Sequence, residues 1–164
     1  MKRNIARTMF VIFCLATLLA STAAGQTVPL SGHWEGVFTQ PKIVPSVQPP
    51  TWFILAQGSG EAAPTARFTI TIPHYVNLVT LKLTGNWFIT PAGNGEDVVM
   101  IDLDEQCRFT GPTTAACEGT GTISSGTGKY ENATGTVSIK VDINLALRTA
   151  KGAFDGTISL AAGN

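Results

Sequence analysis

Charged side chains are scarce in this sequence of 164 residues: Asp, Glu, Lys and Arg make up only 13%, whereas hydrophobic residues make up 44%. A composition this apolar excludes a disordered acidic or basic tail. Three of the eleven basic residues lie in the first seven positions, so residues 26–164 carry eight basic and eleven acidic side chains, a net charge of −3. Because nucleic-acid binding depends on basic side chains that neutralise phosphates, we expect no nucleic-acid partner.

Apolar residues with a helical period are absent from residues 26–164. Short runs of alternating polarity, each ended by Gly, Pro, Asn or Asp, are typical of strands and turns instead. We expect strands, mostly of about eight residues, at 32–39, 51–57, 66–72, 79–90, 99–103, 117–123, 137–143 and 153–160. Residues 41–50 and 58–64 are expected to interrupt this pattern as loops. So many short strands predict an all-β fold, an antiparallel eight-stranded barrel, with a β-sandwich as the alternative.

Titratable residues avoid the apolar faces of the five clearest strands. Charged residues such as Lys82, Asp102, Lys140, Asp142 and Asp155 all fall on the opposite faces. If the apolar faces line the interior, that interior holds few groups for acid–base chemistry. The groups left for such chemistry lie in the first strands and the loops, at His33, Glu35, Tyr75 and Tyr130.

Aromatic residues are the main candidates for ligand binding, because three tryptophans could line an apolar cavity as well as fill a core. The candidate ligand-binding residues are Trp34, Trp52, Trp87, Phe38, Tyr130, Glu35 and His33. No catalytic residue is assigned.

Motifs for metals, cofactors and covalent catalysis are missing. The segment from Gly119 to Lys129 does not fit a phosphate-binding loop, because Ile123 stands where a glycine is needed and Tyr130 follows the lysine. The acidic residues at 96–105 do not fit a calcium-binding loop, and no serine lies in a Gly-x-Ser-x-Gly turn. We therefore expect no cofactor and no metal site.

The N-terminus has the three parts of a secretory signal. Three basic residues precede an apolar run at 9–20, and small residues follow at 21–25. A retained membrane anchor is the alternative, but the run is shorter than the roughly 20 residues that span a bilayer. We expect residues 1–25 to be removed, with cleavage after Ala24 or Gly25. This leaves one domain, 26–164, that has no membrane span and is secreted or periplasmic.

Two cysteines, Cys107 and Cys117, remain after such a cleavage and flank a turn marked by Gly111-Pro112. An even count in an exported chain favours a disulfide. A bridge across this hairpin would stabilise the fold by roughly 2–3 kcal/mol. A metal site is the competing interpretation, but no second pair of soft ligands accompanies the two thiols.

The segment Ser125-Gly-Thr-Gly-Lys-Tyr-Glu-Asn-Ala-Thr-Gly135 contains the pattern G-T-G-x-[FY]-x-x-A-x-G. Together with the strand at 137–143 and residues 152–157, it resembles the C-terminal part of the allene oxide cyclase and dirigent barrel superfamily, which exported bacterial proteins also resemble. The resemblance implies an eight-stranded antiparallel barrel with an apolar pocket, often in a dimer or trimer. The catalytic residues of those families match no position here. Residues 31–34 are also similar to the Gly-x-Trp opening of lipocalins.

The predicted barrel and the resemblance suggest three functions. The first is a non-enzymatic protein that binds a small apolar molecule in the mouth of the barrel. The second is a cyclase or isomerase, as the resemblance implies, that acts by confining a reactive substrate. The third is a structural or surface protein with a filled core. A transmembrane barrel would need lipid-facing apolar residues and longer strands than those expected here.

Overall fold

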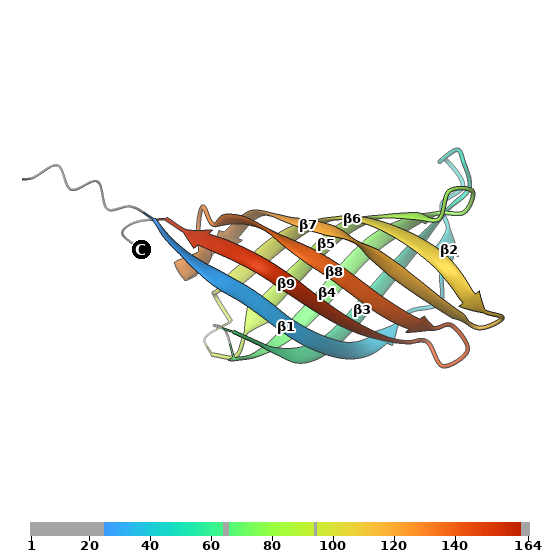
Figure 1. Ribbon diagram of the computed structural model, residues 1–164. Coiled ribbons are helices and arrows are strands. Elements are labelled where there is room, and N and C mark those ends of the chain that lie inside the picture. The colour runs from blue at the N-terminus through green and yellow to red at the C-terminus, as the bar shows by residue number, and fades with distance from the viewer. Residues whose placement is uncertain (1–24, 64–65, 94, 162–164) are drawn as a thin grey trace, which may run out of the picture.

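The computed structural model describes residues 25–63, 66–93 and 95–161, and eight long antiparallel strands of this part of the chain close into a barrel (Figure 1). Almost all of the expected signal sequence lies outside the described residues. The strands are β1 (Gln26–Phe38), β2 (Lys42–Ile43), β3 (Thr51–Ala63), β4 (Ala66–Asn77), β5 (Lys82–Pro91), β6 (Val98–Gly111), β7 (Thr114–Thr127), β8 (Thr134–Asn144) and β9 (Thr149–Leu160). A 3-10 turn, η1 (Gly128–Tyr130), follows β7.

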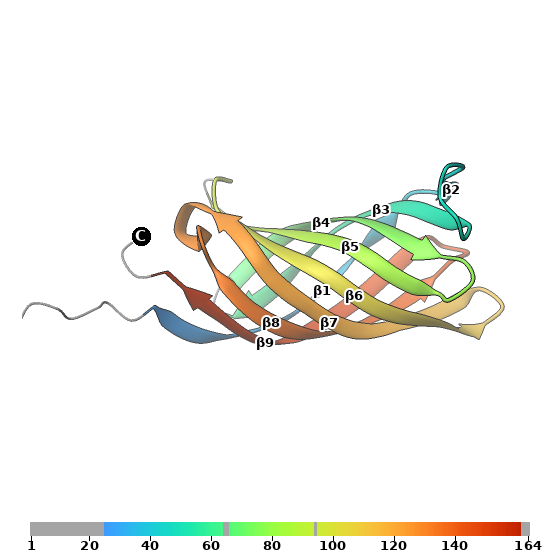
Figure 2. The same ribbon diagram turned by 90° about the horizontal axis from the view of Figure 1, so that it is seen from above.

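Each long strand pairs with the next along the chain, and β1 closes the sheet by pairing with both β9 and β3 (Figure 2). The closing pairs with β3 run from Ser31, opposite Ala63, to Phe38, opposite Ala56. Among the strands of the described residues, only the two-residue β2 lies outside the closed barrel, against the start of β3. Closure pairs the backbone groups that an open sheet would expose at its edges. The eight-stranded barrel expected from the sequence is confirmed, and the sandwich alternative is wrong.

The barrel strands have 10–14 residues, and all except β5 are longer than the sequence suggested. Residues 58–63, expected in a loop, continue β3, and β4 runs through Pro73 to Asn77. Pro73 is tolerated because the β4–β5 pairing is interrupted between Thr71 and His74, so the missing N–H of proline leaves no gap in a continuous ladder.

Residues 79–81, expected to begin a strand, form the turn between β4 and β5 instead. Asn77 holds this turn, since its Oδ1 accepts hydrogen bonds from the backbone N–H groups of Val79 (2.9 Å) and Thr80 (3.0 Å). Leu81 has a φ of 57°, which lies in the left-handed region and outside the extended conformation of a regular strand. The alternating pattern therefore starts at Lys82, and Val79 is 71% exposed rather than buried.

Alternation along the strands divides the side chains between a packed interior and a polar exterior. Isoleucines of β4, β6, β7, β8 and β9 are among the most deeply buried side chains: Ile70, Ile101, Ile123, Ile139 and Ile158. The five charged residues expected on the opposite faces are all exposed on the outside of the barrel. Burial of the apolar face is the main driving force for this fold.

The two ends of the barrel differ. At the far end, where β1 begins and β9 ends, η1 and the residues after it bury Tyr130 and Ala133 against the core. At the opposite end, called the mouth end here, the connections are residues 39–50, 78–81, 112–113 and 145–148. The mouth end lies on the right in Figure 1, away from the C-terminus. The expected loop at 41–50 is found there, apart from the two residues of β2.

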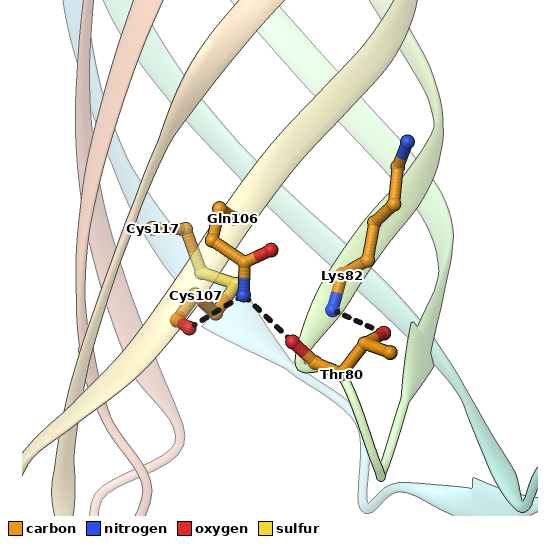
Figure 3. Close-up of a disulfide and its surroundings, with 5 residues drawn as sticks. All are labelled: Thr80, Lys82, Gln106, Cys107 and Cys117. Carbon is orange, nitrogen blue, oxygen red and sulfur yellow. Dashed lines mark hydrogen bonds between the residues drawn. A yellow bond between two sulfur atoms is a disulfide. The ribbon is translucent and has the colours of Figure 1, made fainter.

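A disulfide joins Cys107 of β6 to Cys117 of β7 near the mouth end, as predicted (Figure 3). The two residues lie directly opposite each other in the β6–β7 register. Beside them, Gln106 Nε2 donates hydrogen bonds to the carbonyl oxygens of Thr80 (2.7 Å) and Cys107 (3.2 Å), which ties the β4–β5 turn to β6. The described part of the chain contains no helix long and apolar enough to cross a membrane.

Candidate ligand-binding site

A cavity of about 90 Å³ opens at the mouth end of the barrel, and its walls are almost entirely apolar. Inward residues of all eight long strands line it, and Leu78, Leu81 and Leu145 from the connections surround its opening. We call this space the mouth cavity. It is smaller than the engineered apolar cavity of about 150 Å³ that holds benzene. It therefore suits a small apolar group, with the rest of a larger molecule lying in the opening.

A group of aromatic rings packed edge to face separates the mouth cavity from the far half of the barrel. Trp34 and Trp87 meet edge to face with ring centroids 6.0 Å apart, and Trp87 also contacts Phe154 at 5.7 Å. Gly152, opposite Trp34 in the β1–β9 register, makes this arrangement possible, because a Cβ there would lie 2.2 Å from Trp34 Nε1. The indole nitrogen of Trp34 is buried and has no hydrogen-bond partner among the described residues.

His74 of β4 lies in the wall of the mouth cavity and is 8% exposed. Its Nδ1 lies 3.0 Å from the carbonyl oxygen of Ile72, and since a carbonyl only accepts, Nδ1 carries the proton. In the neutral ring, Nε2 is therefore an acceptor. Burial lowers the pKa of His74 below 6.5, although the hydrogen bond to Ile72 opposes this shift. The cavity wall thus offers a neutral imidazole near pH 7.

Glu105 of β6 also lines the mouth cavity and is only 2% exposed. It lies two residues before Cys107 on the same inward face, about 7 Å deeper along the strand. No cation lies within ion-pair distance among the described residues, and its Oε2 has no hydrogen-bond partner there. Burial raises the pKa of Glu105 to about 7. A carboxyl group held this way is partly protonated at neutral pH and is free to bond with a ligand.

The titratable groups of the cavity wall are therefore not the ones that the sequence suggested for acid–base chemistry. The expectation missed His74 and Glu105 because it took the strands as too short, with β6 ending near Leu103 and β4 ending before Pro73. Because side chains alternate with a period of two, extending β6 by two residues brings Glu105 inside, and extending β4 by two brings His74 inside.

The structure brings together four of the seven candidate ligand-binding residues. Phe38, Trp34, Trp52 and Trp87 all lie in the wall of the mouth cavity. Glu105 and His74 were not among the candidates from the sequence. The alternation of side chains along β4 and β6 places both residues on the inward face once the full lengths of these strands are known.

The other three candidates lie elsewhere. His33 and Glu35 point outward from β1 and are exposed, and Glu35 Oε2 lies 3.3 Å from Lys151 Nζ. Tyr130 is buried at the far end, where the Nζ of Lys129 lies 5.1 Å from the centre of its ring. Burial raises the pKa of the Tyr130 hydroxyl. None of the three lines the mouth cavity.

Within the described residues, no group of three His, Cys, Asp or Glu side chains converges. His74 and Glu105 are the two titratable side chains of the cavity wall besides Arg108, whose guanidinium lies 3.5 Å from Glu118 Oε1. The arrangement can bind an apolar group and offer it one carboxyl and one imidazole.

Solved structures of two dirigent proteins share this fold. The pterocarpan synthase dirigent protein GePTS1 superposes with a TM-score of 0.56 at 12% sequence identity, over 86% of this chain and 88% of that chain. The pterocarpan synthase dirigent protein PsPTS1 gives a TM-score of 0.55 at 12% identity, over 85% of this chain and 99% of that chain. No family model and no curated protein matches the sequence. The chain therefore has a dirigent-like barrel fold, as the resemblance of residues 125–135 implied.

Proposed function

Starting from this dirigent-like barrel, we propose that the protein binds a small, mainly apolar molecule in the mouth cavity, with one polar group of the ligand bonded to Glu105. The observation that carries the proposal is the unpartnered buried carboxyl of Glu105 in an otherwise apolar wall. A carboxyl buried without a partner reduces stability, and a ligand that supplies the missing hydrogen bond removes that penalty. Ligand sites commonly combine apolar walls with a few convergent polar groups of this kind.

The ligand is held by a small apolar end group. The enclosed volume is about 90 Å³, so a terpenoid, fatty or aromatic molecule would place a methyl-bearing or short branched end beside Trp87 and leave the remainder at the opening. The leucines around the opening provide apolar contact for that remainder.

Titration of the tryptophan fluorescence tests this function, because Trp34 and Trp87 lie in the cavity wall. We expect a saturable change with at least one member of a panel of terpenoid, fatty and aromatic compounds. Ala56 lines the cavity and is 3% exposed, so Ala56→Leu fills part of the space and is expected to weaken binding about tenfold or more.

The matched control is Ala153→Leu, the same substitution on the outer face of β9, which should leave affinity unchanged. A panel without any saturable response, or equal affinities of the Ala56→Leu variant and the wild type, would contradict binding in the mouth cavity.

A cyclase or isomerase acting on a confined substrate is the second candidate function. It is favoured by the presence in one cavity of a carboxyl whose pKa lies near 7 and a neutral imidazole, which are a suitable acid and base for proton transfer at neutral pH. Chromatographic analysis of panel compounds after incubation distinguishes the two functions. Conversion that Glu105→Gln abolishes while binding persists would establish the enzyme, whereas unchanged compounds support the binding protein.

We also infer that the protein works outside the cytoplasm, after removal of residues 1–25. The disulfide between Cys107 and Cys117 supports this inference, since such bonds persist in oxidising compartments. N-terminal sequencing of the protein from the exported fraction tests it, and a chain that still begins at Met1 would contradict it.

A further inference from the structure

Exposed apolar side chains gather at the mouth end of the barrel. Among the described residues, all seven large hydrophobic side chains that are exposed lie on the connections of this end or on the strand segments next to them: Val37, Ile43, Val47, Tyr75, Val79, Phe109 and Leu147. Val79 and Leu147, at the tips of the β4–β5 and β8–β9 turns, are each 71% exposed. Exposed apolar groups clustered in this way mark an interaction surface.

Charged side chains are also distributed unevenly between the two ends of the barrel. We define the mouth rim as residues 39–50, 78–82, 107–115 and 144–149. It contains four basic residues, Lys42, Lys82, Arg108 and Arg148, and no acidic residue. Lys82 and Arg108 pair with Asp104 and Glu118 on the barrel wall, whereas Lys42 and Arg148 are exposed and form no ion pair within the described part of the chain.

The far end has the opposite character. Its connections at 91–98 and 127–134 carry the acidic residues Glu96, Asp97 and Glu131. The one basic residue of these two segments, Lys129, lies 3.1 Å from Asp97. None of the exposed large hydrophobic residues of the described chain lies there. The molecule therefore has one apolar, basic end and one polar, acidic end.

The exposed tips of the mouth rim are held in fixed positions. Asn144 Oδ1 accepts a hydrogen bond of 3.0 Å from the backbone N–H of Leu147, and Asn77 fixes the turn that carries Val79. Gln106 fastens the latter turn to β6 beside the disulfide (Figure 3). Because the tips do not have to be ordered on binding, little conformational entropy is lost when a partner covers them.

We propose that the mouth rim docks on the surface of a lipid bilayer that contains anionic lipids. Val79, Leu147 and Ile43 would enter the interface between headgroups and acyl chains, while Lys42 and Arg148 contact the anionic headgroups. Basic residues beside apolar side chains form the pattern that binds such surfaces. The connections that carry these residues are separate from one another at the mouth end of the barrel (Figures 1 and 2), and a deformable lipid surface covers such separate points more completely than a rigid protein partner does.

Docking in this orientation turns the opening of the mouth cavity toward the lipid. If the proposed ligand-binding function holds, an apolar ligand could pass between bilayer and cavity without crossing water. Docking itself does not require a ligand, because the residues proposed to contact the bilayer lie outside the cavity wall: Val79, Leu147, Ile43, Lys42 and Arg148.

Sedimentation with lipid vesicles tests the proposal. We expect the full chain to bind vesicles of phosphatidylcholine mixed with phosphatidylglycerol, and to bind pure phosphatidylcholine vesicles at least tenfold more weakly. The double variant Lys42→Gln/Arg148→Gln should lose about thirtyfold in affinity for the mixed vesicles, since each basic residue near an anionic surface contributes about fivefold. The double variant Val79→Ser/Leu147→Ser should lose more than tenfold, because two apolar tips no longer enter the interface.

Lys140→Gln, which removes an exposed basic residue from the barrel wall, is the matched control and should change affinity less than twofold. Residues 1–25 contribute equally in every variant, so the differences belong to the mouth rim. Absence of binding to mixed vesicles, or binding that neither double variant weakens, would overturn the proposal. So would a dimer that forms without lipid and is lost in the same variants, because a second copy would then cover the rim.

The same variants distinguish a loss of membrane docking from a loss of ligand binding. Neither Val79 nor Leu147 lines the mouth cavity, so the fluorescence titration of their double variant should match that of the wild type.

Discussion

Replacing Glu105 with glutamine is expected to stabilise the protein by about 3 kcal/mol at pH 8, and to change its stability little at pH 4. The carboxyl is buried in an apolar wall without a cation, and this burial raises its pKa from 4.5 to about 7. At pH 8 the folded protein must hold a buried carboxylate that lacks a partner for Oε2. Glutamine has nearly the same shape and never carries that charge.

The direction of the pH dependence follows from proton binding. Between pH 4.5 and about 7 the folded protein keeps the proton of Glu105, whereas the unfolded chain has lost it. Stability from this group is therefore fully present below pH 4.5, falls as the pH rises, and is level above about pH 7. His74 acts in the opposite direction below pH 6.5, because its pKa is lowered and the unfolded chain binds the proton more readily.

Urea unfolding of the wild type and the Glu105→Gln variant between pH 4 and pH 8 measures this effect. His74 is present in both proteins, so the difference between their free energies of unfolding reports on Glu105 alone. Glu131→Gln is the control, since Glu131 is exposed in the β7–β8 connection and should give no such difference. A difference between wild type and Glu105→Gln that stays constant over the whole range would contradict a buried, unpaired carboxyl.

Truncating Trp87 to alanine is expected to lower the free energy of unfolding by about 4 kcal/mol. Trp87 is 1% exposed and lies at the centre of the aromatic group, in contact with both Trp34 and Phe154. Its loss removes one of the largest buried side chains and joins the mouth cavity to the space it leaves. Since the neighbouring strands are fixed by the closed barrel, they can collapse into that space only in part.

Circular dichroism during urea unfolding measures this loss independently of tryptophan fluorescence. Phe109→Ala is a suitable comparison, because Phe109 is 57% exposed at the mouth rim and its truncation should change stability by less than about 1 kcal/mol. Similar stabilities of the two variants would show that the aromatic group does not form the centre of the core.

The barrel could be predicted from the sequence because its strands alternate so regularly. Runs such as 136–143 and 153–160 place aliphatic or aromatic residues at every second position, with Gly156 as the exception, and the cysteine pair flanks a recognisable turn. The aromatic part of the cavity wall followed from the same pattern, since Trp34 and Trp87 both lie on apolar faces.

The polar part of the cavity was missed because strand ends are hard to locate in a sequence. Pro73 ordinarily ends a strand, but here the interruption in the β4–β5 pairing accommodates it, and β4 continues to His74 and beyond. The sequence places Glu105 in an acidic surface cluster if the strand is taken to end near Leu103. The alternation of Val99, Ile101 and Leu103 puts Glu105 on the inward face, and the exposed Asp104 on the outward one, only when β6 continues past Leu103.

The open end of the barrel could not be predicted from the sequence either. Tyr130 belongs to the segment that resembles the dirigent superfamily, yet it is buried at the far end rather than at the cavity. Which end of the barrel holds the cavity depends on the connections. At the far end η1 folds over the barrel, whereas the connections at the mouth end leave the cavity open.

Diffraction from crystals of the protein pressurised with xenon tests most directly whether the mouth cavity is a binding site for apolar groups. Dry apolar cavities bind xenon, whereas polar ones hold ordered water. We predict a xenon atom between Trp87, Leu103 and Glu105, inside the mouth end of the barrel. Side chains that close this space, or ordered waters bonded to Glu105 in place of xenon, would contradict the account.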